Sequence, residues 1–395
     1  MSKPATGYVR QRKNGLWEGQ YTFQREKRSI YGQTREEVTQ ELERIIHSIE
    51  DGNYVRPSQH TLISWLRDWV KTYAKPTLRP STATNYEFTI ERHFTGKLGN
   101  TQLRNISPRM LQNFFNRKLK TGRGDRRPGG LSPKTLKNIR YMLHVALDQA
   151  CHDRLIPFNP LDGVRLPVPD HPEQRVLTSE EKERICDHAT ILNTLYAKGV
   201  IILLTCGLRR GELLGLRWQD VNLTEGLIHV RHTMGRLKKF NVELSPYPYI
   251  RLDDYAPQSN HTALYLGPVK TKSPHGRSIC RHGPCRHLRR SSPITQQLSN
   301  GKAQFNPHNM VFCTEEGHPY EPKTLEEGFQ NILTNLGLKT VNLHATRHTF
   351  ATEALHKSTD IITVSEILGH TKPSTTLDMY GHTFDERKRA LMAQM

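Results

Sequence analysis

The sequence reads CGLRRGELL at residues 206–214, HATR at 344–347, LGH at 368–370 and DMYGH at 378–382. The first motif has an arginine directly after a glycine where a helix is expected to begin. The second spaces an imidazole and a guanidinium three residues apart, which puts both on one face of a predicted helix. Each motif alone is weak, because salt-bridged helix ends and packed tyrosines are common. Together they indicate a site that combines guanidinium, imidazole and phenol groups.

The segment around these motifs, from about residue 175 to the end, predicts helices with a few short strands. Thr178 and Glu181 form a capping box that opens one helix. Strands are predicted at 227–230 and 277–280. Residues 231–266 are polar and rich in Pro and Tyr, and their pattern predicts no particular element.

The N-terminal segment predicts a small β-sheet followed by one helix. Two strands, 7–12 and 16–23, flank an Asn-Gly pair whose residues readily take the positive φ of a tight hairpin. A third strand is expected at 28–31, and a helix from Thr34 until Gly52 stops it. The strands hold most of the basic residues of this segment and the helix is acidic, so the basic face is the sheet.

A helical pattern with strong positive charge follows at residues 57–170, which hold 19 Lys or Arg and 8 Asp or Glu. A solvated surface is the plain explanation, but so large an excess on a short helical domain favours a phosphate-binding surface. The glycine-rich loop 121–130 carries Arg123, Arg126 and Arg127. Repeated prolines then indicate a linker. We therefore predict three domains, comprising residues 1–56, 57–168 and 169–395.

Composition narrows the class of protein. With 57 Lys or Arg, 38 Asp or Glu and a net charge of +19, the chain suits a polyanionic partner, nucleic acid before membrane. Its 35% hydrophobic content excludes a collagen-like or wholly disordered chain. No signal peptide is visible, and the longest apolar run, 200–204, is far shorter than the roughly 20 residues that span a bilayer. These features predict an intracellular protein with no membrane partner.

Cysteine usage predicts reduced thiols rather than a disulfide framework, because six cysteines are scattered over a long chain. Cys280, His282, Cys285 and His287 are the one cluster that has the side chains of a zinc site. Ligands this closely spaced do not easily surround one ion, and arginines flank them, so a basic surface loop is the favoured interpretation. Since no carboxylate cluster indicates a catalytic metal either, we expect no metal and no cofactor.

In their order and spacing, the motifs resemble those of the tyrosine recombinases, also called phage integrases. That family has an arginine after Thr-Gly-Leu or similar, a lysine in a β-hairpin, His-x-x-Arg, Leu-Gly-His, and a tyrosine further on. The matching residues here are Arg209, Lys270, His344, Arg347, His370 and Tyr380. Arg210 and Lys272 are neighbouring alternatives, but Arg209 directly follows Gly-Leu and Lys270 best fits the family's Pro-Lys-Thr context.

The resemblance covers nearly the whole chain and implies a multidomain, mainly α fold with small β elements. The N-terminal three-stranded sheet plus helix resembles the arm-type DNA-binding modules of conjugative-transposon and phage integrases. A helical SAM-like core-binding domain and an α+β tyrosine recombinase catalytic domain are expected to follow.

The resemblance also implies a reaction on DNA. Tyr380 attacks phosphorus and becomes linked to the 3′ phosphate, so the bond energy is stored and rejoining needs no ATP. Arg209 and Arg347 present guanidinium forks that match the non-bridging oxygens of the phosphate and stay charged at any working pH. His370 donates a further hydrogen bond to the same phosphate.

Proton transfer falls to two other residues in this scheme. Lys270 protonates the departing 5′ oxygen, and His344 accepts or positions the proton of the tyrosine. Glu212 is expected to orient Arg209 or its helix rather than to touch the DNA.

The implied partner is double-stranded DNA, bound at core and arm attachment sites by a homotetramer that acts through a Holliday junction. An excisionase is a further candidate partner. The implied role is integration and excision of a mobile element. The implied location is the bacterial cytoplasm, in association with the nucleoid. The candidate DNA contacts are Tyr8, Arg10, Arg12, Lys13, Trp17, Tyr21 and Arg28 in the sheet, and Arg123, Arg126 and Arg127 in the loop. The sheet aromatics have an alternative role, which is to pack against the helix.

Two other functions stay open at this point. A type IB topoisomerase uses a similar arginine, lysine and tyrosine set, and relaxation of a plasmid without attachment sites would favour it. A DNA-binding protein that keeps the fold without the chemistry is the second alternative, although all six matching positions hold chemically competent side chains.

Overall fold

The computed structural model describes residues 7–23, 26–51, 54, 60–123, 128–168, 175–253, 261–269, 305–357, 360–377 and 392, and only the backbone of 277–280. The chain divides into two compact units. Unit 1 comprises residues 1–77 and 82–171, and unit 2 comprises residues 78–81 and 172–395. No helix in the described ranges is both long and apolar enough to cross a membrane.

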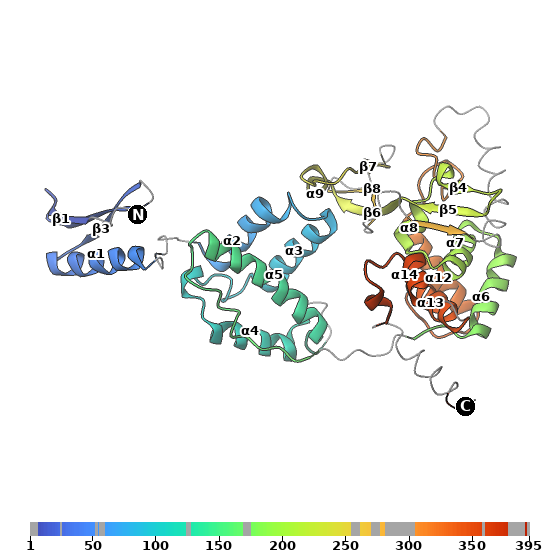
Figure 1. Cartoon of the computed structure of the whole chain (residues 1–395), viewed down its shortest axis with the longest axis horizontal. Helices are drawn as coiled ribbons and strands as arrows, with labels where there is room; N and C mark the ends of the chain where they lie inside the picture. Colours follow the sequence, from blue (N-terminus) through green and yellow to red (C-terminus); the bar gives the residue numbers. More distant parts are fainter. Residues whose placement is uncertain are drawn as a thin grey trace. The chain divides into compact units, whose positions relative to one another are not determined.

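The N-terminal part of unit 1 is a three-stranded antiparallel sheet with one helix packed against it (Figure 1). The elements are β1 (Gly7–Gln11), β2 (Trp17–Phe23), β3 (Glu26–Gly32) and α1 (Arg35–Glu50). Gly15 has a φ of 85° in the turn between β1 and β2. The hydroxyl of Thr34 caps α1 by accepting a hydrogen bond from the Glu37 N–H. The predicted sheet and helix are confirmed.

The two faces of this sheet have different roles because side chains alternate along a strand. Tyr21 and Phe23 of β2 form a small core with Leu42 of α1 and with Tyr54. The hydroxyls of Tyr21 and Tyr54 share a hydrogen bond of 2.6 Å. Odd-numbered residues of β2 therefore face α1, and its even-numbered residues, beginning with Glu18, point away from the helix.

The rest of unit 1 is helical, as predicted. Its elements are α2 (Leu62–Trp69), the π-helical turn η1 (Val70–Ala74), α3 (Pro80–His93), the 3₁₀ turn η2 (Leu103–Asn105), α4 (Pro108–Thr121) and α5 (Pro133–His152). Hydroxyls at Thr61, Ser107 and Ser132 cap α2, α4 and α5. The Trp65 indole N–H donates to the carbonyl of Ala146 at 2.9 Å, which ties α2 to α5.

Unit 2 is built around α7, whose residues are nearly all buried and which packs against α6, α12 and α13 (Figure 1). Its helices are α6 (Ser179–Leu192), α7 (Leu195–Cys206), α8 (Arg210–Leu214), α9 (Lys239–Glu243), α12 (Pro322–Asn335), α13 (Ala345–His356) and α14 (Ile361–Leu368), with the 3₁₀ turn η3 (Trp218–Asp220). The predicted capping box of Thr178 and Glu181 opens α6.

Two small antiparallel sheets complete unit 2. The first contains β4 (Val221–Asn222), β5 (Leu227–Val230) and β9 (Arg277–Cys280), and the second contains β6 (His232–Lys238), β8 (Thr262–Pro268) and β7 (Ile250–Arg251). The strands predicted at 227–230 and 277–280 are confirmed. The stretch 231–266, to which the sequence assigned no element, contains β6, α9, β7 and most of β8.

Candidate active site

Arg209 lies between α7 and α8 and is held by an acid of α8. Its backbone N–H donates to Oε2 of Glu212 at 3.0 Å, and its Nη1 donates to Oε1 at 2.6 Å. The Glu212 side chain is only 4% exposed, so one buried carboxylate fixes both the main chain and the guanidinium of Arg209. The neighbouring Arg210 pairs instead with Glu326. Two adjacent arginines thus have different partners.

Arg347 lies in the first turn of α13 and is 2% exposed. Its Nη1 donates to the carbonyl of Gly207 at 2.8 Å, and its Nη2 donates to the carbonyl of Leu368 at 2.5 Å. These carbonyls end α7 and α14, and helix C-termini carry partial negative charge that favours a cation. Arg209 makes a longer contact of the same kind, 3.5 Å from Nη2 to the carbonyl of Gly369.

Glycine is required where these two helices end. Gly207 and Gly369 have φ values of 63° and 65°, in the left-handed region that costs a residue with a Cβ roughly 1–2 kcal/mol. At Gly207 an added Cβ would also lie 2.3 Å from Cδ1 of Phe350. The two sharp helix ends present the carbonyls that hold Arg209 and Arg347.

His344 is the N-cap residue of α13, just before the helix rather than on the helical face that the sequence predicted. The residue is partly exposed, but its imidazole packs edge-on against the ring of His348, with centroids 4.8 Å apart. Burial of the ring, followed by the positive charges of His348, Arg347 and Arg209, lowers the pKa of His344 to about 4. The imidazole is therefore uncharged at neutral pH and able to accept a proton.

His370 follows α14 and is held at both its main chain and its ring. Its backbone N–H donates to the carbonyl of Ser365 at 3.0 Å. Its Nδ1 lies 2.8 Å from Oγ1 of Thr376, a residue that is 0% exposed. We refer below to five of the residues described so far as the active-site cluster: Arg209, Glu212, His344, Arg347 and His370.

A pocket of about 400 Å³ lies beside this cluster. Arg209, Glu212 and His344 line it, together with Val269, the residue that follows β8. Val269 directly precedes Lys270 in the sequence, so β8 leads the chain to this pocket. The pocket brings the guanidinium of Arg209 close to the uncharged imidazole of His344, two groups that can bind an anion, whereas Arg210 pairs with Glu326 at its edge and neither Arg347 nor His370 is among its lining residues.

Several predicted residues lie outside the described residues. They are Lys270, Tyr380, Arg126 and Arg127, together with His282, Cys285, His287 and the side chain of Cys280. Within the described ranges, no group of three or more His, Cys, Asp or Glu side chains is arranged to hold a metal ion.

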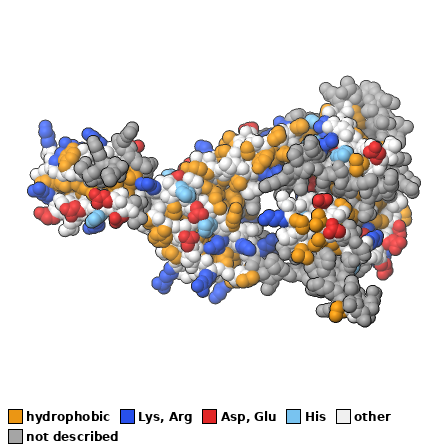
Figure 2. Space-filling view, in the orientation of Figure 1, with side chains coloured by type: hydrophobic (Ala, Val, Ile, Leu, Met, Phe, Trp, Pro, Cys, Tyr) orange, Lys and Arg blue, Asp and Glu red, His pale blue; other side chains and the backbone are white. Residues whose placement is uncertain are grey.

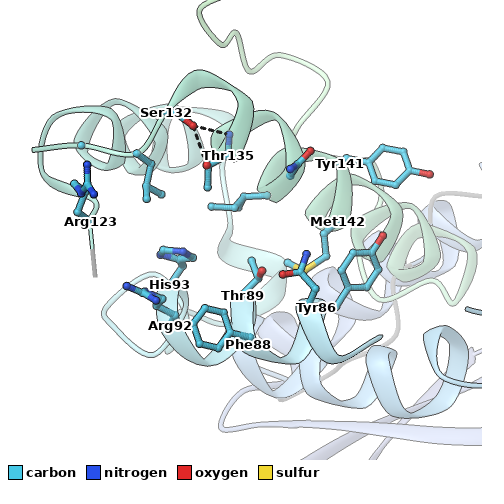
Figure 3. Close-up of a pocket in the computed structure, with 15 residues that line it drawn as sticks. Tyr86, Phe88, Thr89, Arg92, His93, Arg123, Ser132, Thr135, Tyr141 and Met142 are labelled. Atoms are coloured by element: carbon cyan, nitrogen blue, oxygen red, sulfur yellow. Dashed lines mark hydrogen bonds between the residues drawn. The ribbon is translucent and has the colours of Figure 1, made fainter. Parts of the chain in front are cut away.

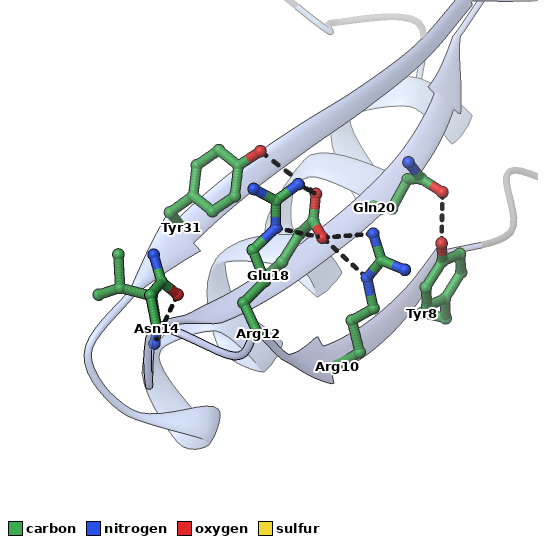
Figure 4. Close-up of polar contacts among 8 residues, drawn as sticks. Tyr8, Arg10, Arg12, Asn14, Glu18, Gln20 and Tyr31 are labelled. Atoms are coloured by element: carbon green, nitrogen blue, oxygen red, sulfur yellow. Dashed lines mark hydrogen bonds and ion pairs between the residues drawn. The ribbon is translucent and has the colours of Figure 1, made fainter.

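The face of the N-terminal sheet that points away from α1 carries a network centred on Glu18 (Figure 4). Glu18 is 1% exposed, and its carboxylate accepts hydrogen bonds from Nε of Arg10 at 2.8 Å, Nε of Arg12 at 3.0 Å and the hydroxyl of Tyr31 at 3.2 Å. Hydrogen bonds from Arg12, Ser29 and Arg10 lower the pKa of Glu18 to about 2. This Glu18 network, comprising Arg10, Arg12, Glu18 and Tyr31, thus keeps two partly exposed guanidiniums together.

The other predicted contacts of the sheet divide between its two faces. Tyr8 lies on the same face as the Glu18 network (Figure 4), and Lys13 is exposed at the hairpin turn. Tyr21 is 2% exposed and belongs to the core, which removes it from the candidate DNA contacts. Trp17 and Arg28 lie on the α1 side of the sheet with Tyr21. The alternative role of the sheet aromatics, packing against the helix, therefore applies to Tyr21.

A larger pocket of about 850 Å³ lies between α3 and α5 in unit 1 (Figure 3). Phe88 and Arg92 of α3 line one side, and the Arg92 guanidinium lies 5.2 Å from the centre of the Phe88 ring. Tyr141 of α5 and the predicted loop residue Arg123 line the other side. Phe88 is 56% exposed and Tyr141 is 64% exposed, which is unusual for large aromatic side chains. The groove offers exposed rings and guanidiniums side by side.

Two family models match the sequence. The one described as "Phage integrase, N-terminal SAM-like domain" matches residues 61–119, and the one described as "Phage integrase family" matches residues 175–387, more than half of the chain. The chain belongs to the phage integrase family. In this integrase the first match covers α2 to α4, and the second covers the whole active-site cluster together with Lys270 and Tyr380.

Curated relatives agree with the family match. The integrase is 25% identical over 379 residues to a "Tyrosine recombinase XerC-like" protein of Caldanaerobacter subterraneus subsp. tengcongensis, covering 92% of this chain and 89% of the relative. It is 23% identical to the ICEBs1 integrase of Bacillus subtilis, covering 79% of this chain and 77% of that one. The enzyme class is therefore that of a tyrosine recombinase.

Solved structures have the same fold. The Tn1549 transposon integrase in complex with transposon right end DNA matches with a TM-score of 0.66 at 21% identity, covering 85% of this chain and 99% of that one. A lambda integrase tetramer bound to a Holliday junction matches with a TM-score of 0.54 at 18% identity, covering 92% and 96%. The expected fold class, mainly α with small β elements and a SAM-like domain before the catalytic domain, is confirmed.

Sequence reasoning missed several residues of these sites. Glu18 and Thr376 were not among the predicted site residues. The groove residues Phe88, Arg92 and Tyr141 were missed as well. Of these residues, only those of the groove could have been predicted from a local sequence pattern. Phe88 and Arg92 are four positions apart on a helix, so they lie on one face.

Proposed function

We propose that this integrase is a site-specific DNA recombinase that cuts and rejoins DNA through a 3′-phosphotyrosyl intermediate. One observation carries the proposal. Arg209, His344 and Val269 at the end of β8 line one pocket, and hydrogen bonds join Arg209 to Gly369 and Arg347 to Leu368 beside it. Family membership supplies the chemistry for this arrangement.

Arg209 and Arg347 would hold the scissile phosphate, and His370 would donate a further hydrogen bond to it. Negative charge grows on the non-bridging oxygens in the transition state, and guanidiniums fixed in advance stabilise that charge without having to reorganise. Glu212 and the carbonyls at helix ends supply this fixation.

Tyr380 would be the nucleophile: its oxygen bonds to phosphorus as the bond to the 5′ oxygen breaks. His344 would take the tyrosine proton, and its pKa of about 4 supports this role because the free imidazole dominates at neutral pH. Lys270 would give a proton to the departing 5′ oxygen, and the position of Val269 at the pocket supports it.

DNA would be bound by three domains with the predicted limits 1–56, 57–168 and 169–395. The open face of the N-terminal sheet, with Arg10 and Arg12, would contact arm sites. The groove between α3 and α5 would contact core sites through Arg92 and Arg123, since Lys and Arg are visible over the surface of unit 1 (Figure 2). Stacking on exposed aromatic rings would add affinity for any base that leaves the helix.

The assembly we propose is a homotetramer on duplex DNA that integrates and excises a mobile element at the bacterial nucleoid, with an excisionase setting the direction. Two related structures, a transposon integrase on transposon DNA and a lambda integrase tetramer on a Holliday junction, support this choice. Net charge of +19 supports a strong dependence of DNA affinity on salt.

A nicked suicide substrate tests the proposal. Candidate core sites from the DNA flanking the gene are incubated with the full chain in EDTA and separated on a denaturing gel. A slower band that disappears in Tyr380→Phe is expected. A clear mobility shift on native gels with no covalent band on any candidate site would favour the non-catalytic alternative. Relaxation of a plasmid without attachment sites would favour the topoisomerase.

A further inference from the structure

The corner after α14 involves three members of the active-site cluster. The carbonyls of Leu368 and Gly369 accept hydrogen bonds from Arg347 and Arg209, and the next residue is His370. The Nδ1 of His370 lies 2.8 Å from Oγ1 of Thr376, in the helical turn at 373–377. Thr376 thus contacts the cluster from the segment that leads to Tyr380.

Thr376 differs from its neighbours in this turn. It is 0% exposed, whereas the adjacent Thr375 is exposed. A buried hydroxyl costs free energy unless it forms a hydrogen bond, and the His370 ring provides that partner.

The hydrogen bond couples the position of the ring proton of His370 to the direction in which the Thr376 hydroxyl donates. A neutral imidazole has one N–H donor and one acceptor nitrogen, whereas a hydroxyl can play either part. If the hydroxyl donates to Nδ1, the ring proton must lie on Nε2, at the opposite edge of the ring. In that tautomer, Nε2 is the nitrogen through which a neutral His370 can donate to a phosphate oxygen. The reverse tautomer would present a lone pair to that oxygen and repel it.

We infer that Thr376 is a positioning residue, which holds His370 in the Nε2–H form and aims that donor at the scissile phosphate. The inference rests on the proposed function for the identity of the anion, but the tautomer itself does not depend on it. Thr376 does not touch the phosphate, and it acts only through His370.

The first measurement is spectroscopic. The full chain labelled with ¹⁵N-histidine is compared with Thr376→Val, which keeps the shape of the side chain without its hydroxyl, and with Thr376→Ser, which keeps the hydroxyl. Thr375→Val is the matched control, and His370→Gln assigns the signal. We expect the His370 ring in the wild type to show a protonated Nε2 and a bare Nδ1. The signal should shift in Thr376→Val and return to the wild-type position in Thr376→Ser. A wild-type ring protonated on Nδ1 would overturn the inference.

The second measurement is single-turnover cleavage of the suicide substrate. Loss of the buried hydrogen bond should slow Thr376→Val roughly 10-fold, while Thr376→Ser stays near the wild-type rate. In a His370→Ala background, Thr376→Val should cause no further loss, because its only route to the phosphate is gone. An equal loss in both backgrounds would indicate a merely structural role and refute the inference.

The two proposals fail in different ways. A wild-type chain that forms no Tyr380-dependent adduct counts against the proposed function, and the spectrum of His370 still decides the tautomer. An adduct that forms normally in Thr376→Val counts against the inference alone. Thermal denaturation of each variant shows whether a lost rate reflects a lost fold.

Discussion

The active-site cluster and the Glu18 network each combine two arginines with one buried carboxylate, but they hold the guanidiniums differently. In the network both arginines bond to Glu18 itself. In the active site Glu212 bonds to Arg209, and Arg347 is held by main-chain carbonyls at two helix ends. Carbonyls are uncharged and belong to the backbone. The two groups therefore have the same formal charge, but in the network both guanidiniums share one carboxylate, whereas in the cluster the guanidinium of Arg347 is bound by uncharged carbonyls.

Exposure sharpens the contrast. The Arg10 and Arg12 side chains are 53% and 45% exposed, whereas Arg347 is 2% exposed. Water screens charges at the sheet face and weakens their interactions, while burial strengthens those in the cluster. The comparison teaches that similar residues are held on an exposed surface in one place and in a buried, fixed arrangement in the other.

The largest effect is expected for Arg347→Lys, which keeps the charge but cannot bridge two carbonyls. A lysine lacks the planar fork, so both the fixation and the geometry toward phosphate are lost. Single-turnover cleavage should fall roughly 10²- to 10³-fold. Arg184 is the matched control, because its Nη2 also donates to a helix-end carbonyl, that of Leu336, but on the exposed surface. Equal cleavage rates for Arg347→Lys and Arg184→Lys would contradict the importance of the buried, carbonyl-bound guanidinium of Arg347.

Gly207→Ala tests the helix end whose carbonyl holds Arg347. Positive φ and the overlap with Phe350 should together lower the free energy of unfolding by about 2–4 kcal/mol. Gly337 has a similar φ of 65°, with no atom within 4 Å of an added Cβ, so Gly337→Ala should cost only about 1–2 kcal/mol. Urea denaturation of both variants measures the difference. Identical losses would mean that the contact with Phe350 is unimportant.

The pH profile tests whether the cluster holds its imidazole uncharged. A base is active when unprotonated, and the pKa of about 4 leaves His344 unprotonated throughout pH 5.5–8. An ordinary histidine, with a pKa near 6.5, would lose about tenfold in rate by pH 5.5. We expect single-turnover cleavage to change much less than this between pH 7.5 and 5.5. A tenfold fall that disappears in His344→Gln would contradict the assignment.

The smallest effect is expected at the sheet face. Glu18→Gln releases two guanidiniums and raises the net charge by one, so affinity for any duplex should rise slightly while preference for arm DNA falls. We expect the affinity ratio between flanking-DNA and scrambled duplexes to drop roughly 2- to 10-fold, measured by fluorescence anisotropy. Glu26→Gln removes the same charge at a residue that pairs with Arg28 outside the Glu18 network, and it should leave the ratio unchanged. If the affinity ratio fell equally in both variants, Glu18 would have no specific role in the preference for arm DNA.

Local signals made much of the fold predictable. The Asn-Gly hairpin, the Thr178 capping box and the strands at 227–230 and 277–280 depend on a few adjacent residues, and all are found. Residues 231–266 were unpredictable because β6 pairs with β8 across a long intervening segment, which leaves no short pattern. The register of that pairing is a property of the tertiary fold.

The sequence predicted which residues belong to the candidate site, but not which groups hold them in place. The order and spacing of four motifs, which resemble those of a known family, predicted Arg209, His344, Arg347 and His370, and the structure describes all four. The carbonyls that hold Arg347 belong to residues far away in the sequence, and no side-chain pattern encodes them. Thr376 was missed for the same reason, since only the folded corner brings it to His370.

The central claim is that this pocket directs Tyr380 onto a DNA phosphate. Its most direct test is mass spectrometry of the covalent adduct after protease and nuclease digestion. The account predicts one modified peptide, in which Tyr380 is joined to a 3′ phosphate. Attachment to another residue, or to a 5′ phosphate, would contradict it.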